Sequence, residues 1–321
     1  NLYHKKGGDH VGGLARIIQE TLGRKGNVVI PAFAVGRTQE LLYMIRHIKE
    51  KKLVTGHDGF QVYVDSPLAV EATHVFKQNM VECYDEETKA LVERGINPID
   101  FPGLKLSVTS EESKNINFDM TPKVIISAAG MCDAGRIRHH LKHNLWREEC
   151  SVVFAGYQAE GTLGRLLQDG TPAVKIFGEE IDVKAHIETL DGISGHADRD
   201  GLLTWAAAFE QKPKYVFVVH GNDESCESLT DALTTQLGLT AKAPYSGSEF
   251  DLIRGLWIRE TEPVLVEAET QATRKATGIY TRLVDAGQML MDVIARNQGG
   301  ANQDLKRFTE QILALCEKWN R

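Results

Sequence analysis

The chain has 321 residues, enough to bury at least one sizeable core, and two domains are the expectation for this length. Its 42% hydrophobic and 25% charged residues are ordinary for a soluble globular protein, and no apolar run is long enough to span a membrane. The net charge of −7 excludes a surface that is basic throughout, so a nucleic-acid substrate requires a local basic cleft.

Helices and strands alternate through the first half of the chain. Apolar residues recur at helical spacing, as in Leu14, Ile17, Ile18 and Leu22, and short β-branched runs such as residues 28–30 lie between them. This alternation predicts an α/β fold with a mostly parallel sheet. The expected helices are residues 12–24, 36–52, 69–80 and 85–94, and the expected strands are residues 28–30, 60–65, 123–127 and 150–156.

A basic helix follows the strand at 123–127 and the glycine turn at Gly130. It carries six basic or histidine side chains, and no acidic residue occurs from Gly135 to Lys142. One interpretation is a solvated helix face, and the other is a basic wall for a phosphodiester backbone. The strand at 150–156 leads into Glu160-Gly161-Thr162, which predicts either a phosphate contact at a helix start or a capped helix.

The second half of the chain contains a predicted domain boundary. Residues 173–177 and 181–190 have strand character, and Gly178-Glu179-Glu180 between them is predicted to be a hinge. Residues 181–262 then predict strand, helix, strand, helix and a last strand near 249–252. We therefore expect three regions, namely a parallel-sheet domain at 1–180, a second layer at 181–262, and a helical extension at 263–321.

The helical extension contains two amphipathic stretches. Ile279, Leu283, Leu290 and their neighbours recur at spacings of three and four, residues 297–302 interrupt the pattern, and Leu305 to Trp319 resume it. Each stretch has only about two heptads, too few for a coiled coil. We expect a helical hairpin that docks on the body or forms a homodimer.

Two histidines occupy matched positions in the second layer. His196 in Ser194-Gly195-His196-Ala197-Asp198 and His220 in Val218-Val219-His220-Gly221-Asn222 each follow a strand-like run and precede a helical pattern. Chemistry in α/β sheets gathers at the carboxyl ends of strands, so one shared site is expected. The alternative for any single histidine is a hydrogen-bonded core or surface residue, and Asp198 has a sufficient role as a helix cap.

Five cysteines are scattered along the chain and form no CxxC pair. Their odd number and spacing predict neither a disulfide framework nor a cysteine zinc site, and they favour a reducing cytoplasm. They are Cys83, Cys132, Cys150, Cys226 and Cys316.

Six segments in order resemble the β-CASP branch of the metallo-β-lactamase superfamily. The two histidine segments are similar to its motifs B and C, and four earlier segments are similar to other parts of that branch. The four are Pro31-Ala32-Phe33-Ala34-Val35-Gly36-Arg37, Val64-Asp65-Ser66-Pro67-Leu68-Ala69, Ser127-Ala128-Ala129-Gly130-Met131, and Gly156-Tyr157-Gln158-Ala159-Glu160-Gly161-Thr162-Leu163-Gly164. The resemblance covers roughly residues 1–250. It implies a β-CASP parallel-sheet domain followed by the C-terminal part of a metallo-β-lactamase αββα sandwich.

The resemblance also implies a function, a zinc-dependent RNA-cleaving hydrolase with two zinc ions in the complete enzyme. It makes His220 a zinc ligand and His196 a general acid or phosphate contact beside the scissile phosphate. The substrate contacts that it implies, with RNA as partner, are Arg37, Ser127, Gly130, Arg136, Tyr157, Glu160, Thr162 and Ser194.

The family's main metal-binding cluster is missing from this sequence. No His-x-His-x-Asp-His occurs in the chain, which begins at Asn1 just after the position of motif A. One ligand does not hold two zincs, so we expect a substrate-binding cap plus half a catalytic domain, with partial zinc occupancy at most. Two alternatives are a non-catalytic RNA-binding or scaffold protein of the same fold, and a metallo-hydrolase acting on a small ester or amide.

Overall fold

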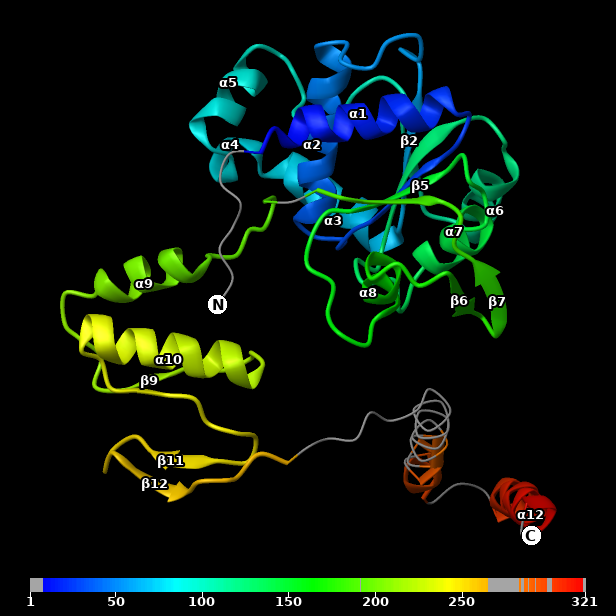
Figure 1. Ribbon diagram of the computed structural model, residues 1–321. Helices are drawn as coiled ribbons and strands as arrows, with labels where there is room; N and C mark the ends of the chain where they lie inside the picture. Colours follow the sequence, from blue (N-terminus) through cyan, green and yellow to red (C-terminus); the bar gives the residue numbers. More distant parts are fainter. Residues whose placement is uncertain are drawn as a thin grey trace. The chain divides into compact units, whose positions relative to one another are not determined.

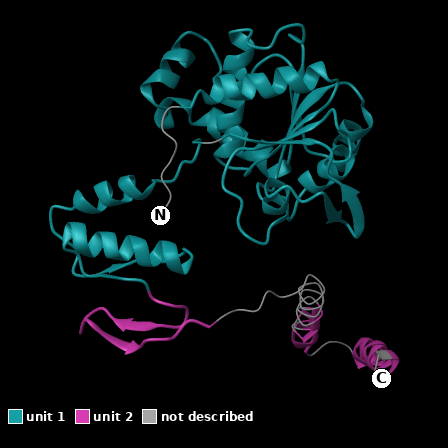
Figure 2. Cartoon of the chain, in the orientation of Figure 1, with its two compact units in different colours: residues 1–243 teal, residues 244–321 magenta. Residues whose placement is uncertain are grey.

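The computed structural model describes residues 8–190 and 192–264, together with residues 283, 286–287, 289–291, 293–298 and 302–319. The chain divides into two compact units, residues 1–243 and 244–321 (Figure 2).

Within residues 8–190, six strands form one sheet in which every pairing is parallel. All residues of the three strands β4, β1 and β5 are buried, as expected for a sheet covered on both faces. This arrangement confirms the predicted α/β class. The strands, in spatial order, are β3 (Leu104–Ser107), β2 (Gln61–Asp65), β4 (Lys123–Ser127), β1 (Val28–Pro31), β5 (Ser151–Phe154) and β8 (His186–Thr189).

Helices cover both faces of the sheet (Figure 1). Successive side chains of a strand point to opposite faces, so Val28 and Ile30 pack in one core cluster while Val29 packs in the other. The first cluster includes apolar side chains of α1 (His10–Gly23), α2 (Arg37–Glu50) and α3 (Pro67–Gln78). The second includes side chains of α6 (Ser110–Phe118), α7 (Ile137–Asn144) and α8 (Leu163–Gln168). Two short helices, α4 (Met80–Cys83) and α5 (Glu86–Glu93), follow α3.

Between residues 104 and 118, the structure has two elements that were not expected from the sequence, β3 and α6. Only Ser107 of β3 is buried, so this edge strand lacks the continuous apolar run that marks β1 and β4. The start of α6 has a local signature, since Thr109 and Glu112 form a capping box. The structure therefore adds a strand and a helix between residues 104 and 118.

The segment predicted as a hinge is part of a hairpin. β6 (Ala173–Ile176) and β7 (Glu179–Asp182) pair antiparallel, and Phe177 and Gly178 form the turn with φ of 52° and 90°. Positive φ at both turn positions matches the twist of a two-residue hairpin. β8 then pairs with β5, so the main sheet continues past residue 180. The division into regions 1–180, 181–262 and 263–321 stays a prediction.

Residues 192–243 form a smaller arrangement of two helices and two short strands. The helices are α9 (Arg199–Ala207) and α10 (Asp223–Leu237), and β9 (Val216–Phe217) pairs parallel with β10 (Ala241–Lys242). Val28–Pro31 and Val216–Phe217 lie in different sheets.

In the second unit, β11 (Glu249–Asp251) and β12 (Leu256–Arg259) form an antiparallel hairpin, and α12 (Asn302–Trp319) is the second predicted C-terminal helix. The first helix of the predicted pair lies largely outside the described residues. None of the helices in the described parts of the chain combines the length and the apolar character needed to cross a membrane.

Candidate functional site

Most of the predicted site residues follow strands of the main sheet at one edge. Because all six strands are parallel, their carboxyl ends share this edge, which we call the carboxyl edge. Arg37 follows β1, Ser127 ends β4, and the β5 strand leads into Tyr157. The predicted residues that occupy these strand ends and the segments after them are Arg37, Ser127, Gly130, Arg136, Tyr157, Glu160 and Thr162.

At the end of β2, Asp65 lies at the centre of a buried hydrogen-bonded network. Its side chain is fully buried, and four side chains from β3, α6 and the segment after β4 donate to or contact its carboxylate. Ser107 Oγ donates to Oδ1 at 2.8 Å and Ser113 Oγ donates to Oδ2 at 2.5 Å. Arg136 Nη1 lies 2.7 Å from Oδ1, and His140 Nε2 lies 2.7 Å from Oδ2.

This network lowers the pKa of Asp65. Burial by itself raises the pKa of a carboxyl group, but the hydrogen bonds from His140, Ser113 and Arg136 and the charge of His140 outweigh it and lower the pKa to about 2. Asp65 is therefore ionised at neutral pH. A buried carboxylate with this many donors ties the end of β2 to β3, α6 and α7, which supply the donors.

Arg136 and Ser127, both predicted substrate contacts, direct their hydrogen bonds into this network. Arg136 Nη2 donates to Val108 O at 2.6 Å in addition to the ion pair with Asp65, and its side chain is 20% exposed. Ser127 Oγ donates to Asp65 O at 2.7 Å. Both side chains therefore tie β2, β3 and β4 together.

The basic helix α7 is mainly occupied by contacts within the fold. The Arg138 guanidinium lies 4.4 Å from the Phe177 ring centroid, and the His139 ring lies 4.5 Å from the same ring. Lys142 Nζ pairs with Glu179 Oε1 at 2.6 Å. Burial lowers the pKa of His139, which removes positive charge from this face. These contacts favour a helix face that holds the β6–β7 hairpin over a basic wall for RNA.

The segment after β5 has a capped helix, one of the two alternatives expected there. Thr162 Oγ accepts from Arg165 N at 3.2 Å and donates to Ala159 O at 2.7 Å, so its hydroxyl caps α8. Glu160 is exposed, and Tyr157 has 66% of its surface exposed. Tyr157 therefore presents an accessible ring at the carboxyl edge.

Phe33, which the sequence did not single out, presents a second ring at this edge. It follows β1, the neighbour of β5 in the sheet, and is 53% exposed. Gly130 packs against it, because a Cβ there would approach Phe33 N to 3.2 Å. Gln158 Nε2 donates to Gly130 O at 3.0 Å and fixes the same turn. The signal available in the sequence was an aromatic residue two positions after the apolar run of β1.

Arg37 opens α2 and is held by its own helix. Its Nη1 pairs with Glu40 Oε2 at 2.5 Å, and its side chain is 15% exposed. The guanidinium thus carries one intrahelical ion pair at the carboxyl edge.

His196 and His220 both stand between a strand and a capped helix, as predicted. His196 is exposed, and its backbone N–H donates to Ser194 Oγ at 3.2 Å. Asp198 caps α9 by accepting from Gly201 N at 2.9 Å, which confirms the cap expected for it. His220 is exposed with φ of 64°, an uncommon conformation for a residue other than glycine. Asn222 caps α10 by accepting from Ser225 N at 2.9 Å.

The described residues do not fit a dinuclear zinc site. Within them, no group of three or more His, Cys, Asp or Glu side chains is arranged to hold a metal ion. A catalytic zinc needs about three protein ligands and an open position for water. The described residues therefore do not by themselves supply the donor set of one catalytic zinc.

Two family models match this chain in the order of its two regions. Residues 38–167 match the β-CASP domain. Residues 180–244, which contain both histidines, match the Zn-dependent metallo-hydrolase RNA specificity domain. The chain belongs to the β-CASP family. The first match includes the Asp65 network and most segments of the carboxyl edge, and the second begins in the β6–β7 hairpin.

Similar proteins include a ribonuclease and several transcription termination factors. Ribonuclease TTHA0252 of Thermus thermophilus is 38% identical over 215 residues, which are 66% of this chain and 47% of the relative. Transcription termination factor FttA of Thermococcus kodakarensis is 32% identical over 246 residues, 75% of this chain and 37% of the relative. FttA of Methanocaldococcus jannaschii is also 32% identical, over 75% of this chain and 38% of the relative. The chain thus spans less than half the length of these β-CASP relatives.

Proposed function

We propose that this β-CASP chain carries the RNA-binding surface and two site histidines of a zinc-dependent RNA-cleaving hydrolase. The observation that carries the proposal is that His196 and His220 lie in the stretch similar to an RNA specificity domain, each directly before a capped helix. The name of the Thermus relative, a ribonuclease, supports the same reaction class.

For the substrate, we propose RNA with unpaired bases. Phe33 and Tyr157 offer exposed rings after adjacent strands, and unpaired bases stack on such rings without regard to sequence. Arg37, Gly130, Glu160, Thr162 and Ser194 remain proposed contacts to the RNA. For Arg136 and Ser127, whose hydrogen bonds go to Asp65, we propose that they position the contact segments.

For the chemistry, we propose that His196 lies beside the scissile phosphate and donates a proton to the leaving oxygen. An imidazole titrates near neutral pH, which suits a general acid. We propose His220 as a zinc ligand in a site shared with His196, because neutral imidazole is a common ligand of zinc. Zinc would supply Lewis acidity, and its remaining ligands are not grouped in the described residues.

The second candidate is a non-catalytic RNA-binding or scaffold protein. It is favoured by the lack of a three-ligand group in the described residues and by relatives named transcription termination factors. Under this alternative the carboxyl edge still binds RNA, and neither histidine takes part in bond cleavage. The two candidates therefore differ in cleavage and in zinc content.

RNA binding is tested by fluorescence anisotropy with a labelled single-stranded RNA. Tyr157→Ala is expected to weaken binding by about 1–3 kcal/mol, the value of one base–aromatic stack. Trp146→Ala is the matched control, because Trp146 is also an exposed aromatic but precedes β5 at the opposite edge of the sheet. Equal affinity for Tyr157→Ala and Trp146→Ala would contradict the proposed RNA surface.

Cleavage and zinc content separate the two candidates. We expect the 321-residue chain by itself to hold fewer than two zinc ions and not to cleave RNA at an enzymatic rate, because a two-zinc site needs about three ligands per metal. Activity is expected when an amino-terminal metallo-β-lactamase half is supplied as a separate chain, and it should be lost in His196→Ala and His220→Ala. RNA binding with no cleavage under these conditions favours the scaffold.

The assembly state and location are further proposals. One face of α12 carries Leu305, Phe308 and Ile312, and we propose that the C-terminal helices form a homodimer. Analytical ultracentrifugation of the wild type and of Phe308→Glu tests this, since a monomeric wild type rules it out. All five cysteines are free, which agrees with the proposed cytoplasmic location.

A further inference from the structure

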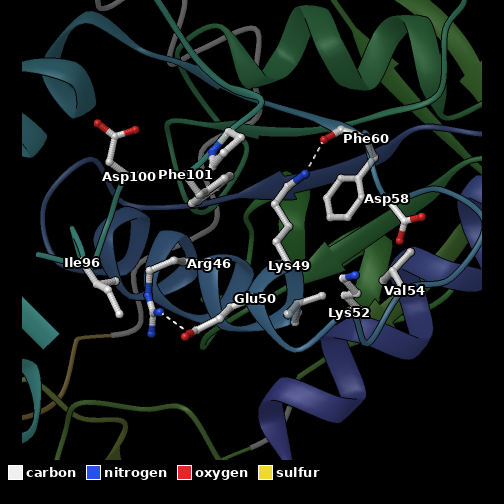
Figure 3. Close-up of a pocket in the computed structure, with 12 residues that line it drawn as sticks. Arg46, Lys49, Glu50, Lys52, Val54, Asp58, Phe60, Ile96, Asp100 and Phe101 are labelled. Carbon is white, nitrogen blue, oxygen red and sulfur yellow. Dashed lines mark hydrogen bonds and ion pairs between the residues drawn. The ribbon is translucent and has the colours of Figure 1, made fainter. Parts of the chain in front are cut away.

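A cavity of about 460 Å³ lies at the amino ends of β2 and β3, at the edge opposite the carboxyl edge. Phe60 immediately precedes β2, and Phe101 and Pro102 shortly precede β3. The end of α2 supplies Arg46 and Lys49 (Figure 3). The volume is within the range of small-molecule pockets, and half of the twelve lining residues are apolar.

Lys49 places its ammonium group between a carbonyl and an aromatic ring of this cavity. Nζ donates to Phe60 O at 2.6 Å and lies 3.8 Å from the Phe60 ring centroid and 5.8 Å from that of Phe101. In the described part of the chain, no carboxylate forms an ion pair with it. An ammonium group has three donors, so Lys49 has hydrogen-bonding capacity left. Burial lowers its pKa, which agrees with an incompletely compensated charge.

Arg46 lines the same cavity and has a donor without a partner. Its side chain is 5% exposed, and Nη1 pairs with Glu50 Oε2 at 2.6 Å. Nε is buried and makes no hydrogen bond. A buried donor left unpaired costs free energy comparable to a lost hydrogen bond. Since Nε is buried and the guanidinium points to Glu50 (Figure 3), Arg46 forms part of the cavity wall, and Lys49 is the donor that faces a ligand.

The charges at the cavity leave one positive charge in excess. Glu50 is paired with Arg46, and Asp100 is paired with Lys77 at 2.6 Å. Lys49 and Lys52 then stand against Asp58 alone, two positive charges against one negative. A ligand with a single negative charge would balance them.

We propose that this cavity binds a small organic monocarboxylate with a flat apolar body. The carboxylate accepts a hydrogen bond from Lys49 Nζ, and the body lies against Phe60 and Phe101. A nucleoside monophosphate fits less well, since its two negative charges exceed the single excess charge and its ribose is polar. The site is separate from the proposed RNA surface, because the two lie at opposite edges of one sheet.

Calorimetric titration of the 321-residue protein with 2-naphthoate tests the proposal. The neutral isostere 2-naphthamide is expected to bind about tenfold more weakly or worse, because it lacks the charge-assisted hydrogen bond. Adenosine monophosphate and inorganic phosphate are expected not to compete with 2-naphthoate. Equal affinity for the acid and the amide, or no binding of 2-naphthoate at millimolar concentration, would overturn the proposal without any variant.

Lys49→Met is the matching variant, because methionine keeps most of the apolar stem and removes the ammonium group. It is expected to weaken 2-naphthoate binding about tenfold or more. Lys51→Met is the control, since Lys51 is exposed and does not line the cavity. Unchanged affinity in a folded Lys49→Met protein, checked by circular dichroism, would contradict the role of Lys49. If that variant does not fold, methyl shifts of Ile96 in the wild type decide, and unmoved shifts at saturation overturn the site.

Discussion

Two regions of the molecule hold their proposed site residues in different ways. The sheet body, residues 8–190, has two large core clusters on the two faces of a six-stranded sheet. The histidine segment, residues 192–243, has one cluster with four buried apolar residues, Ala206, Leu233, Leu239 and Ala241. The histidine segment therefore has far less buried apolar surface to define its conformation.

The same difference appears in the hydrogen bonds. Arg136 and His140 reach Asp65 across 71 and 75 residues of sequence. Beside His196 and His220, local side-chain bonds run over two or three residues, as in the Ser194 contact and the Asn222 cap. Long-range contacts thus hold the carboxyl edge of the sheet, and local bonds shape the turn and the helix start beside the histidines.

The largest expected effect is in the sheet body, from Asp65→Asn. Removing the buried carboxylate leaves Arg136 and His140 without their shared partner, and breaking a buried pair costs about 3–5 kcal/mol. Urea unfolding at neutral pH measures the loss. Asp169→Asn is the control, because its pair with Arg165 is exposed and should contribute less than about 1 kcal/mol. Equal losses for the two variants would remove the distinction between buried and exposed pairs.

In the histidine segment, Leu233→Ala should cost about 2–3 kcal/mol, near the lower limit for a buried leucine because the cluster is small. The loss of stability should be confined to this region, so that backbone amide hydrogen exchange accelerates in α10 and stays unchanged in β1 and β4. Gln236→Ala, at an exposed position of the same helix, serves as control. Acceleration throughout the main sheet would show that the two regions unfold together.

The third prediction concerns how the contribution of Asp65 to stability depends on pH. The pKa of Asp65 falls from 3.8 to about 2 on folding, so its contribution is complete above about pH 4 and is lost as the pH falls through about 2. At about 1.4 kcal/mol per pH unit, the stability difference between wild type and Asp65→Asn should shrink by about 2 kcal/mol over that window. Chemical unfolding from pH 5 to pH 2 measures it. A constant difference would mean that folding does not lower the pKa of Asp65.

The smallest expected effect tests whether the helix cap at Asn222 orients His220. Asn222→Ala removes the cap of α10 and should cost about 1 kcal/mol, whereas Asn222→Ser retains a capping oxygen and should restore most of it. The imidazole resonances of His220 should broaden or shift in the alanine variant, since the residue adjoins this helix start. Unaltered resonances would indicate that other contacts orient His220.

Several features of the fold follow from sequence alone because their causes are local. The buried runs in β1 and β4, the apolar faces of α1 and α2, and the cap at Asp198 depend on neighbours within a few residues. β3 and the turn at Phe177–Gly178 were missed or misassigned. β3 is a half-exposed edge strand, and the role of Gly178 depends on which strand pairs with which.

The sequence by itself determined the class of fold, its family resemblance, and the position of His196 and His220 at strand-to-helix junctions. Tertiary structure alone decided what Arg136 and Ser127 do. Both were expected to contact the substrate, yet they bind Asp65, because the folded sheet brings β2, β3, β4 and α7 together at one edge. The tertiary structure also formed the cavity around Lys49, which is lined by α2 and by the residues before β2 and β3. These segments are far apart in the sequence, so no local pattern of residues indicates that they meet.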